Sequence, residues 1–282
     1  MSLSIFIMYS PDRKDALDRT VSCLRNMNLY DQCQKTLIVD QKSNVSLPEW
    51  NTIEVPRIED KFCWAYMWDA GVNSARFENI LYLDSDRMMG RNYLKLVVDQ
   101  LEDGVFVFTS NHFMMLKNLP IQRCQDLLDR FEEEGLITDE DFMGAARFEA
   151  RYAEPVHGPG KNVMSGSTAF TKSTYWNLGG VDPWYRGHGA FADTDFHFAA
   201  KMGGCKFIDL GIPEFHFPHP KRDGEGNEIE EMKLRRMGLD NFIYYCVKWK
   251  LPIAIAENVA HSCNIRRPDR YVQKRAKGIV NG

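Results

Sequence analysis

The feature that most constrains the fold is an apolar run at residues 79–86 that ends in two carboxylates separated by one residue, Asn-Ile-Leu-Tyr-Leu-Asp-Ser-Asp. A run of this kind predicts a strand buried on both faces of an α/β sheet. Asp84 and Asp86 then lie where the strand leaves the sheet, the edge at which α/β proteins bind ligands. Two hard oxygen donors there would hold a divalent cation, Mn²⁺ or Mg²⁺, with positions left for phosphate oxygens. Taken alone, the two aspartates are equally typical of a simple turn.

The N-terminal part of the chain predicts a β-α-β unit. Apolar strands are expected at residues 3–9 and 36–39, and a helical pattern of apolar residues at 13–28 lies between them. A crossover helix makes such strands parallel and their connection right-handed. The turn from Tyr9 to Arg13 and the carboxylate of Asp40 should therefore face one crevice at the same edge of the sheet.

Helices and strands are expected to alternate along the remainder. The pattern predicts strands at 53–55, 79–84, 105–109, 164–171 and 205–210, and helices at 62–77 (interrupted by Gly71), 94–101, 193–203 and 229–250. Residues 119–155 instead favour two helices, the second beginning near Thr138. We therefore expect one α/β domain over 1–220 with a helical insertion at 111–160. Residues 221–282 would add a flexible loop, an amphipathic helix and a basic tail packed on the same domain.

Composition excludes several classes of function. A net charge of -4 and a pI near 6.0 give no overall footprint for nucleic acid. The basic stretch 266–277 allows at most peripheral contact with an anionic membrane, and solvation of the chain end is the simpler interpretation. No apolar stretch is long enough to span a bilayer and the N-terminus has no basic leader, so a cytoplasmic protein is expected. Seven cysteines without a Cys-x-x-Cys pair predict reduced thiols.

Short motifs follow one another in a recognisable order over residues 3–220. They are the Tyr9–Arg13 turn, Asp40 at a strand end, a helix over 64–75, Asp84-Ser85-Asp86, Gly179-Gly180-Val181-Asp182, Asp193-Thr194-Asp195, and His216. This order resembles the GT-A nucleotide-sugar glycosyltransferases, particularly the family 2-like and polypeptide N-acetylgalactosaminyltransferase-like groups. The resemblance implies a three-layer α/β/α sandwich with a mixed, mostly parallel sheet and a C-terminal helical extension. It also implies transfer of a sugar from a UDP-sugar to a hydroxyl of a glycan, lipid or protein.

The resemblance assigns a role to each motif residue. Asp193 would be the general base for the acceptor hydroxyl, with helix capping as its alternative. Trp184 would stack on a sugar, with simple packing as its alternative. The implied metal ligands are Asp84, Asp86 and His216, with His219 as a competing ligand. The implied nucleotide-sugar contacts are Tyr9, Pro11, Arg13, Asp40, Asp69, Asp84, Asp86, Gly180, Trp184 and Asp195.

The chain departs from the pattern at a few positions. Ala192 stands where the family usually has a Glu that contacts sugar or acceptor, Val181 where Phe is usual, and Asp69 where Asn is common. The loss at Ala192 leaves an alternative open, a nucleotide-sugar-binding protein with little or no transfer activity. Lys221 and Arg222 begin a Gly-containing loop that we expect to close over the diphosphate.

Overall fold

The computed structural model describes residues 2–9, 13–41, 43–58, 63–109, 111–115, 121–134, 146–148, 166–187, 191–217 and 230–281. Several predictions fall outside these ranges: Pro11, His219, the loop that starts at Lys221 and Arg222, and the insertion helix expected near Thr138. They stay predictions.

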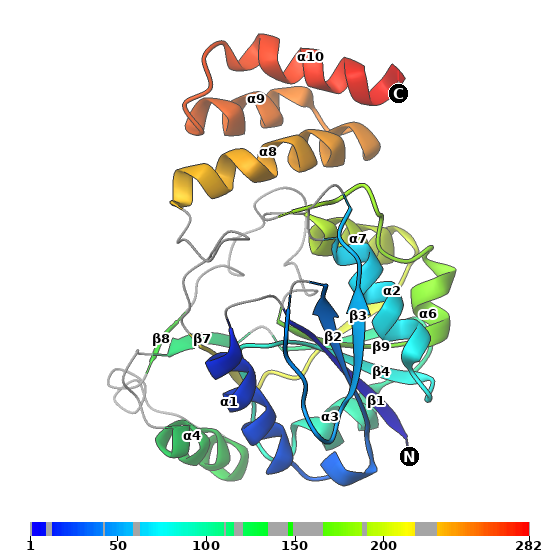
Figure 1. The fold of residues 1–282 in the computed structure, drawn as a ribbon, viewed down its shortest axis with the longest axis vertical. Coiled ribbons are helices and arrows are strands. Elements are labelled where there is room, and N and C mark those ends of the chain that lie inside the picture. Colours follow the sequence, from blue (N-terminus) through cyan, green and yellow to red (C-terminus); the bar gives the residue numbers. More distant parts are fainter. Residues whose placement is uncertain are drawn as a thin grey trace.

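A mixed, mostly parallel sheet forms the centre of the described chain (Figure 1). Strands β1, β2, β3 and β4 are mutually parallel, β9 runs antiparallel to its neighbours β4 and β6, and β10 is parallel to β6. The order across the sheet is β10-β6-β9-β4-β1-β2-β3. The bounds are β1 Leu3–Tyr9, β2 Gln34–Asp40, β3 Asn51–Val55, β4 Asn79–Asp84, β6 Val105–Phe108, β9 Ser167–Thr171 and β10 Lys206–Asp209.

The register places three strand ends side by side. In the pairing of β1 with its neighbours, Tyr9 lies opposite Val39 of β2, and Met8 lies opposite Asp84 of β4. The carboxyl ends of these strands therefore meet at one edge, which confirms the predicted β-α-β unit.

Alternate residues of β1 pack against two different helical layers. Ile5 and Ile7 belong to a core with α1 (Lys14–Arg25), α3 (Tyr93–Gln100) and α4 (Ile121–Glu134). Phe6 and Met8 belong to a core on the opposite face. This alternation is the two-residue period of a strand buried on both faces. The helices of the second face are α2 (Trp64–Ser74), α6 (Lys172–Asn177) and α7 (Ala192–Met202). A short 3-10 helix, η1 (Tyr30–Gln32), precedes β2.

A smaller sheet crosses the carboxyl edge. Its strands are β5 (Arg87–Met88), β11 (Pro213–His216), β7 (Asn111–Met115) and β8 (Ala146–Phe148), in the order β5-β11-β7-β8. The segment 111–160 thus contributes strands as well as α4, so it is not purely helical as expected. The strands escaped prediction because β7 pairs with β11, which lies far away in the sequence, and neither is long enough to show a period of its own.

The C-terminal region is more ordered than predicted. The helices α8 (Glu231–Lys248), α9 (Ile253–Ser262) and α10 (Pro268–Asn281) stack on one another above the sheet (Figure 1). The expected helix at 229–250 is α8, whereas the expected basic tail is the helix α10. Its buried Val272 belongs to the same core as residues of α8 and α9, so this segment is stabilised by packing against the neighbouring helices.

The structure also describes the cysteines, the position of Gly71 and the lengths of the helices. All seven cysteines are free thiols, most of them buried, as the odd count and spacing predict. Gly71 lies inside α2 without interrupting it. No helix in the described ranges is both long and apolar enough to cross a bilayer.

Candidate active site at the carboxyl edge of the sheet

Asp86 is the centre of a cluster of charged side chains at the carboxyl edge. Its carboxylate is buried, and Oδ2 accepts a hydrogen bond of 3.0 Å from Nη1 of Arg13, the residue that precedes α1. Nε2 of His216 lies 3.5 Å from the same Oδ2. The structure thus brings together side chains from three predicted motifs that are far apart in sequence.

Strand pairing explains why His216 arrives beside Asp86. β5 follows the Asp-x-Asp turn directly and runs antiparallel to β11, with Arg87 opposite His216. The backbone N–H of Phe217 then donates to the carbonyl oxygen of Asp86 at 2.9 Å. These main-chain contacts fix the distance between the two proposed ligands independently of their side chains.

Arg87 is a buried cation that the sequence interpretation missed. Its guanidinium lies 3.4 Å from Asp84 Oδ2, 3.2 Å from Asp86 Oδ1 and 3.0 Å from Oε1 of the fully buried Glu214. Buried charges are tolerated only when they are paired, so this arginine is what allows three carboxylates to gather here. A visible signal existed, since Arg87 follows Asp86 directly and Glu214 precedes His216 by two residues.

Asp84 occupies the more open side of the cluster. Burial raises the pKa of its carboxyl group, while the nearby Arg87 guanidinium acts to lower that pKa. The Tyr82 hydroxyl donates to its Oδ1. Asp84 and Asp86 therefore differ in surroundings, although the sequence presents them as an equivalent pair.

Two of the three predicted metal ligands are placed to bind one divalent cation. For bonds of about 2.1 Å, neighbouring octahedral ligands lie about 3 Å apart, and the 3.5 Å between Asp86 Oδ2 and His216 Nε2 is close to that value. Within the described residues, however, no three His, Cys, Asp or Glu side chains converge closely enough to hold an ion. Asp86 and His216 thus fit as ligands, and Asp84 would need to turn towards them.

The predicted nucleoside pocket carries an unexpected arginine. Asp40, at the end of β2, is buried and accepts hydrogen bonds from Arg57 Nε at 2.9 Å and 2.8 Å, one to each carboxylate oxygen. Tyr9 is buried at the adjacent strand end. Any ligand contact with Asp40 would therefore be shared with Arg57.

Asp69 is connected through Tyr175 to the turn Gly179-Gly180-Val181-Asp182. Its Oδ1 accepts a hydrogen bond of 2.6 Å from the Tyr175 hydroxyl, whose oxygen in turn accepts from the Val181 N–H at 3.1 Å. Gly180 has φ +70°, and a Cβ there would lie 3.2 Å from the Tyr175 ring. Burial raises the pKa of Asp69, with the tyrosine hydrogen bond acting against it. Glycine at 180 is thus required by both conformation and space.

Asp195 is held by the C-terminal helices rather than exposed to the crevice. Its carboxylate is 3% exposed and accepts from Tyr185 Oη at 3.0 Å, Trp249 Nε1 at 2.6 Å and Lys248 Nζ at 2.7 Å. Lys248 also donates to Asp182 at 2.8 Å. Burial raises the pKa of Asp195, while Lys248 acts to lower it. These partners indicate that Asp195 attaches α8 to the sheet-containing body, a use of the residue that sequence did not suggest.

Comparison with known proteins identifies the fold. No protein-family profile and no curated protein matches the sequence. Among solved structures, GalNAc-T7 with UDP, GalNAc and Mn²⁺ aligns with a TM-score of 0.57 and 12% identity, over 100% of this chain and 57% of its own. The mannosyltransferase PcManGT from Pyrobaculum calidifontis, in complex with GDP-Man and Mn²⁺, aligns with a TM-score of 0.50 and 12% identity. The alignment covers 99% of this chain and 74% of the mannosyltransferase. S. aureus TarS 1-349 in complex with UDP-GlcNAc aligns with a TM-score of 0.50 and 8% identity, over 92% of this chain and 70% of TarS 1-349.

The chain has the GT-A glycosyltransferase fold. At these identities the likeness concerns architecture alone, and the chain spans little more than half the length of GalNAc-T7. It agrees with the observed mixed sheet, the two helical layers and the C-terminal helical extension.

Within this GT-A fold, the remaining predicted residues lie around the start of α7. Asp193 is half-buried in the first turn of α7, where its Oδ1 accepts from the Thr194 N–H at 2.9 Å. Ala192, at the position expected for Glu, is buried at the beginning of the same helix. Trp184 lies on the loop after Asp182 and stacks on Tyr244 of α8. Asp193 thus stands in the first turn of α7 beside Asp195, whose carboxylate is bound by Lys248 of α8.

Proposed function

We propose that the protein is a metal-dependent glycosyltransferase that moves a sugar from a nucleoside diphosphate donor, UDP-sugar in the first instance, to a hydroxyl of a glycan, lipid or protein. The observation that carries the proposal is the convergence of Asp86 and His216 at the carboxyl edge of a GT-A fold. An acidic pair alone is typical of a turn. An acidic pair that meets a histidine from a distant strand is instead typical of a metal site.

Asp86 and His216 would hold Mn²⁺ or Mg²⁺, with Asp84 as a third ligand. A mixed oxygen and imidazole donor set favours Mn²⁺ over Mg²⁺. When bound, the ion supplies Lewis-acid stabilisation of the departing diphosphate. Arg13 contacts the same Asp86 oxygen, so its guanidinium would have to move towards the diphosphate oxygens, with which it would pair well.

Asp193 would accept the proton of the acceptor hydroxyl as that hydroxyl attacks the anomeric carbon. Its carboxylate is oriented by the hydrogen bond that it accepts from the Thr194 N–H in the first turn of α7. On the nucleotide side, Tyr9, Asp40 and Arg57 would line the pocket, with Asp69 and Gly180 shaping the turn towards the sugar.

A second candidate function is nucleotide-sugar binding without transfer. The observation that favours it is the alanine at 192, which removes a carboxylate from the start of α7. The two candidates share a donor site and differ only in whether the sugar is transferred.

The test is calorimetric titration with UDP and GDP, each with and without Mn²⁺, on the wild-type chain and on Asp86→Asn and His216→Ala. We expect metal-dependent UDP binding that each variant weakens by at least about tenfold, about 1.4 kcal/mol. Asp99→Asn is the matched control, because Asp99 is an exposed residue of α3 that forms an ion pair with Lys95 of the same helix. A melting curve for each variant verifies folding.

Metal-independent UDP binding, or no binding of either nucleotide by a folded wild-type chain, would contradict the proposal. Release of UDP from UDP-sugar in the presence of acceptor mixtures then separates the two candidates. Donor binding without such turnover favours the binding protein, and turnover abolished by Asp193→Asn favours the transferase.

A further inference from the structure

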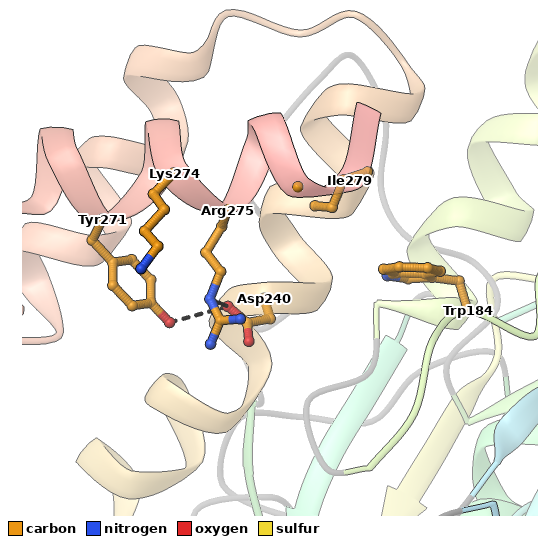
Figure 2. A pocket seen from close by; sticks show the side chains of 7 residues that line it. Trp184, Asp240, Tyr271, Lys274, Arg275 and Ile279 are labelled. Atoms are coloured by element: carbon orange, nitrogen blue, oxygen red, sulfur yellow. Dashed lines mark hydrogen bonds and ion pairs between the residues drawn. The ribbon is translucent and has the colours of Figure 1, made fainter. Parts of the chain in front are cut away.

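A cavity of about 610 Å³ separates α10 from the loop that follows Asp182. Trp184 forms one side, and Asp240 of α8 together with Tyr271, Lys274 and Arg275 forms the opposite side (Figure 2). Its size is within the range of small-molecule sites, and it is lined mainly by apolar surface with a few charged groups, as such sites usually are. None of the motif residues except Trp184 belongs to it.

Trp184 lines this cavity with an exposed aromatic side chain. Its ring is 47% exposed, which is high for a tryptophan, and it stacks on Tyr244 with a centroid distance of 4.7 Å and an interplanar angle of 18°. Since Tyr244 supports one face, the exposed part of the ring is available to a ligand. Flat aromatic faces attract the polarised C–H groups on the face of a sugar ring because the π-system is negative at its face.

The stacked pair is held rigidly by one carboxylate. Asp182 Oδ1 accepts from the backbone N–H of Trp184 at 2.9 Å, and Oδ2 accepts from the Tyr244 hydroxyl at 2.9 Å and from Lys248 Nζ at 2.8 Å. Both members of the pair are therefore anchored to the same group. Preorganisation of this kind reduces the entropy that a ligand loses on binding.

The opposite side of the cavity carries a net positive charge. Asp240 accepts a hydrogen bond from Tyr271 Oη at 3.0 Å and pairs with Arg275 Nε at 3.3 Å. Lys274 is exposed, and no carboxylate in the described part of the chain forms an ion pair with it. Since Asp240 and Arg275 compensate one another, Lys274 leaves one positive charge for an anionic group.

Gly278 of α10 lines the cavity without a side chain. A Cβ added there would meet nothing within 4 Å, and its φ is not in the left-handed region, so neither packing nor conformation requires glycine. Glycine inside a helix costs about 1 kcal/mol relative to alanine. A larger side chain at this position could therefore be introduced to fill the cavity without a backbone clash.

From these features we infer that the cavity between Trp184 and α10 binds an anionic sugar unit of the acceptor, with the ring against Trp184 and its carboxylate or sulfate at Lys274. The acceptor role rests on the proposed function. Tyr185, the neighbour of Trp184, is hydrogen-bonded to Asp195, which lies two residues from the candidate base Asp193. The loop that carries the aromatic side chain is thus joined by a hydrogen bond to the first turn of α7, which carries the candidate base.

The test is titration of the full chain, without donor, with three tetrasaccharides: hyaluronan (carboxylates without sulfate), heparin (sulfates in addition to carboxylates) and chitotetraose (neutral). We expect at least one anionic probe to bind more tightly than the neutral one. Trp184→Ala and the cavity-filling Gly278→Leu should each weaken that binding by at least about tenfold. Lys274→Ala should remove the preference for the anionic probe and leave binding of the neutral one nearly unchanged.

Matched controls exist for two variants. Trp176→Ala removes another exposed tryptophan, located on α6, and Lys277→Ala removes a cation of α10 that lines a separate groove. Both should bind the probes as the wild type does. Absence of binding, equal affinity for charged and neutral probes, or equal losses in Trp184→Ala and Trp176→Ala would each overturn the inference. UDP titration in parallel distinguishes the failures, since intact UDP binding without glycan binding refutes only the acceptor cavity.

Discussion

Replacement of Lys248 by methionine is the substitution whose consequence the structure defines best. Lys248 Nζ is the cation shared by Asp182 and Asp195, at 2.8 Å and 2.7 Å, and it connects α8 to the start of α7. Methionine retains most of the side-chain volume and removes the charge. The Asp195 carboxylate would keep its hydrogen bonds to Tyr185 and Trp249 but would lose its only cation among the described residues.

The expected cost follows from burial. Removal of one partner from a buried ion pair costs about 3–5 kcal/mol, and the 29% exposure of the Lys248 side chain lets water compensate part of that cost. We therefore expect a loss of about 2–3 kcal/mol in unfolding free energy near neutral pH. For a chain of this size such a loss lowers the melting temperature by about 4–10 °C.

The pH dependence of the Lys248→Met defect provides a second test. Burial raises the pKa of Asp195 in the folded state, and loss of Lys248 removes a group that acts to lower that pKa, so the variant's folded pKa is higher still. When the folded-state pKa lies above the unfolded-state pKa, the folded state binds more protons at pH values between these two pKa values. Stability therefore increases as the pH falls through that range. The defect should hence be smaller at about pH 5 than at about pH 7.5.

The pH dependence of the defect is measured by melting curves at both pH values. These are recorded for the wild type, Lys248→Met, Asp195→Asn and the double variant. The double variant should be less destabilised than the sum of the single ones, because the neutral amide no longer needs the cation. A defect that is equal at both pH values, or strict additivity, would refute the interpretation of Lys248 as the counter-ion of Asp195.

Two further predictions concern packing and thiol chemistry. Gly71→Ala should destabilise the protein by about 1–3 kcal/mol although alanine is the better helix former, because its Cβ would lie 2.6 Å from the Phe6 ring; an unchanged or higher melting temperature would contradict this. Iodoacetamide should modify Cys205 first in the native protein, because it is half-buried whereas the other six cysteines are buried. Burial raises the pKa of Cys205 as well, and it raises the pKa of Cys33 to about 11 and of Cys124 to about 12. Peptide mapping after brief labelling decides this, and early modification of Cys124 would count against it.

The arrangement of the central domain could be predicted from the sequence because its signals are local. The apolar runs of β1, β2 and β4 are long, and a helix between parallel strands forces their carboxyl ends to one edge. For that reason the proximity of Arg13, Asp40 and the Asp84–Asp86 turn follows from residue order. Motif order was also sufficient to indicate the GT-A fold.

The tertiary structure decided which charges are paired and which are available. Arg57 covers Asp40, Arg87 neutralises the Asp-x-Asp turn from within, and Lys248 takes up Asp195. The Arg57–Asp40 and Lys248–Asp195 pairs have no periodic or spacing signal, because each joins segments whose proximity depends on how the whole chain folds. Arg87 follows Asp86 directly in the sequence, but its burial against Glu214 depends on the pairing of β5 with β11.

The same reason applies to the Asn79–Asp86 stretch and to the C-terminal end. Sequence alone determines that this stretch is a buried strand that ends in two carboxylates. Only the pairing of β5 with β11 brings His216 to 3.5 Å from Asp86, and only the packing of α10 opposite Trp184 creates a cavity there. Local residue preferences specify the elements, whereas contacts between distant residues specify what those elements can bind.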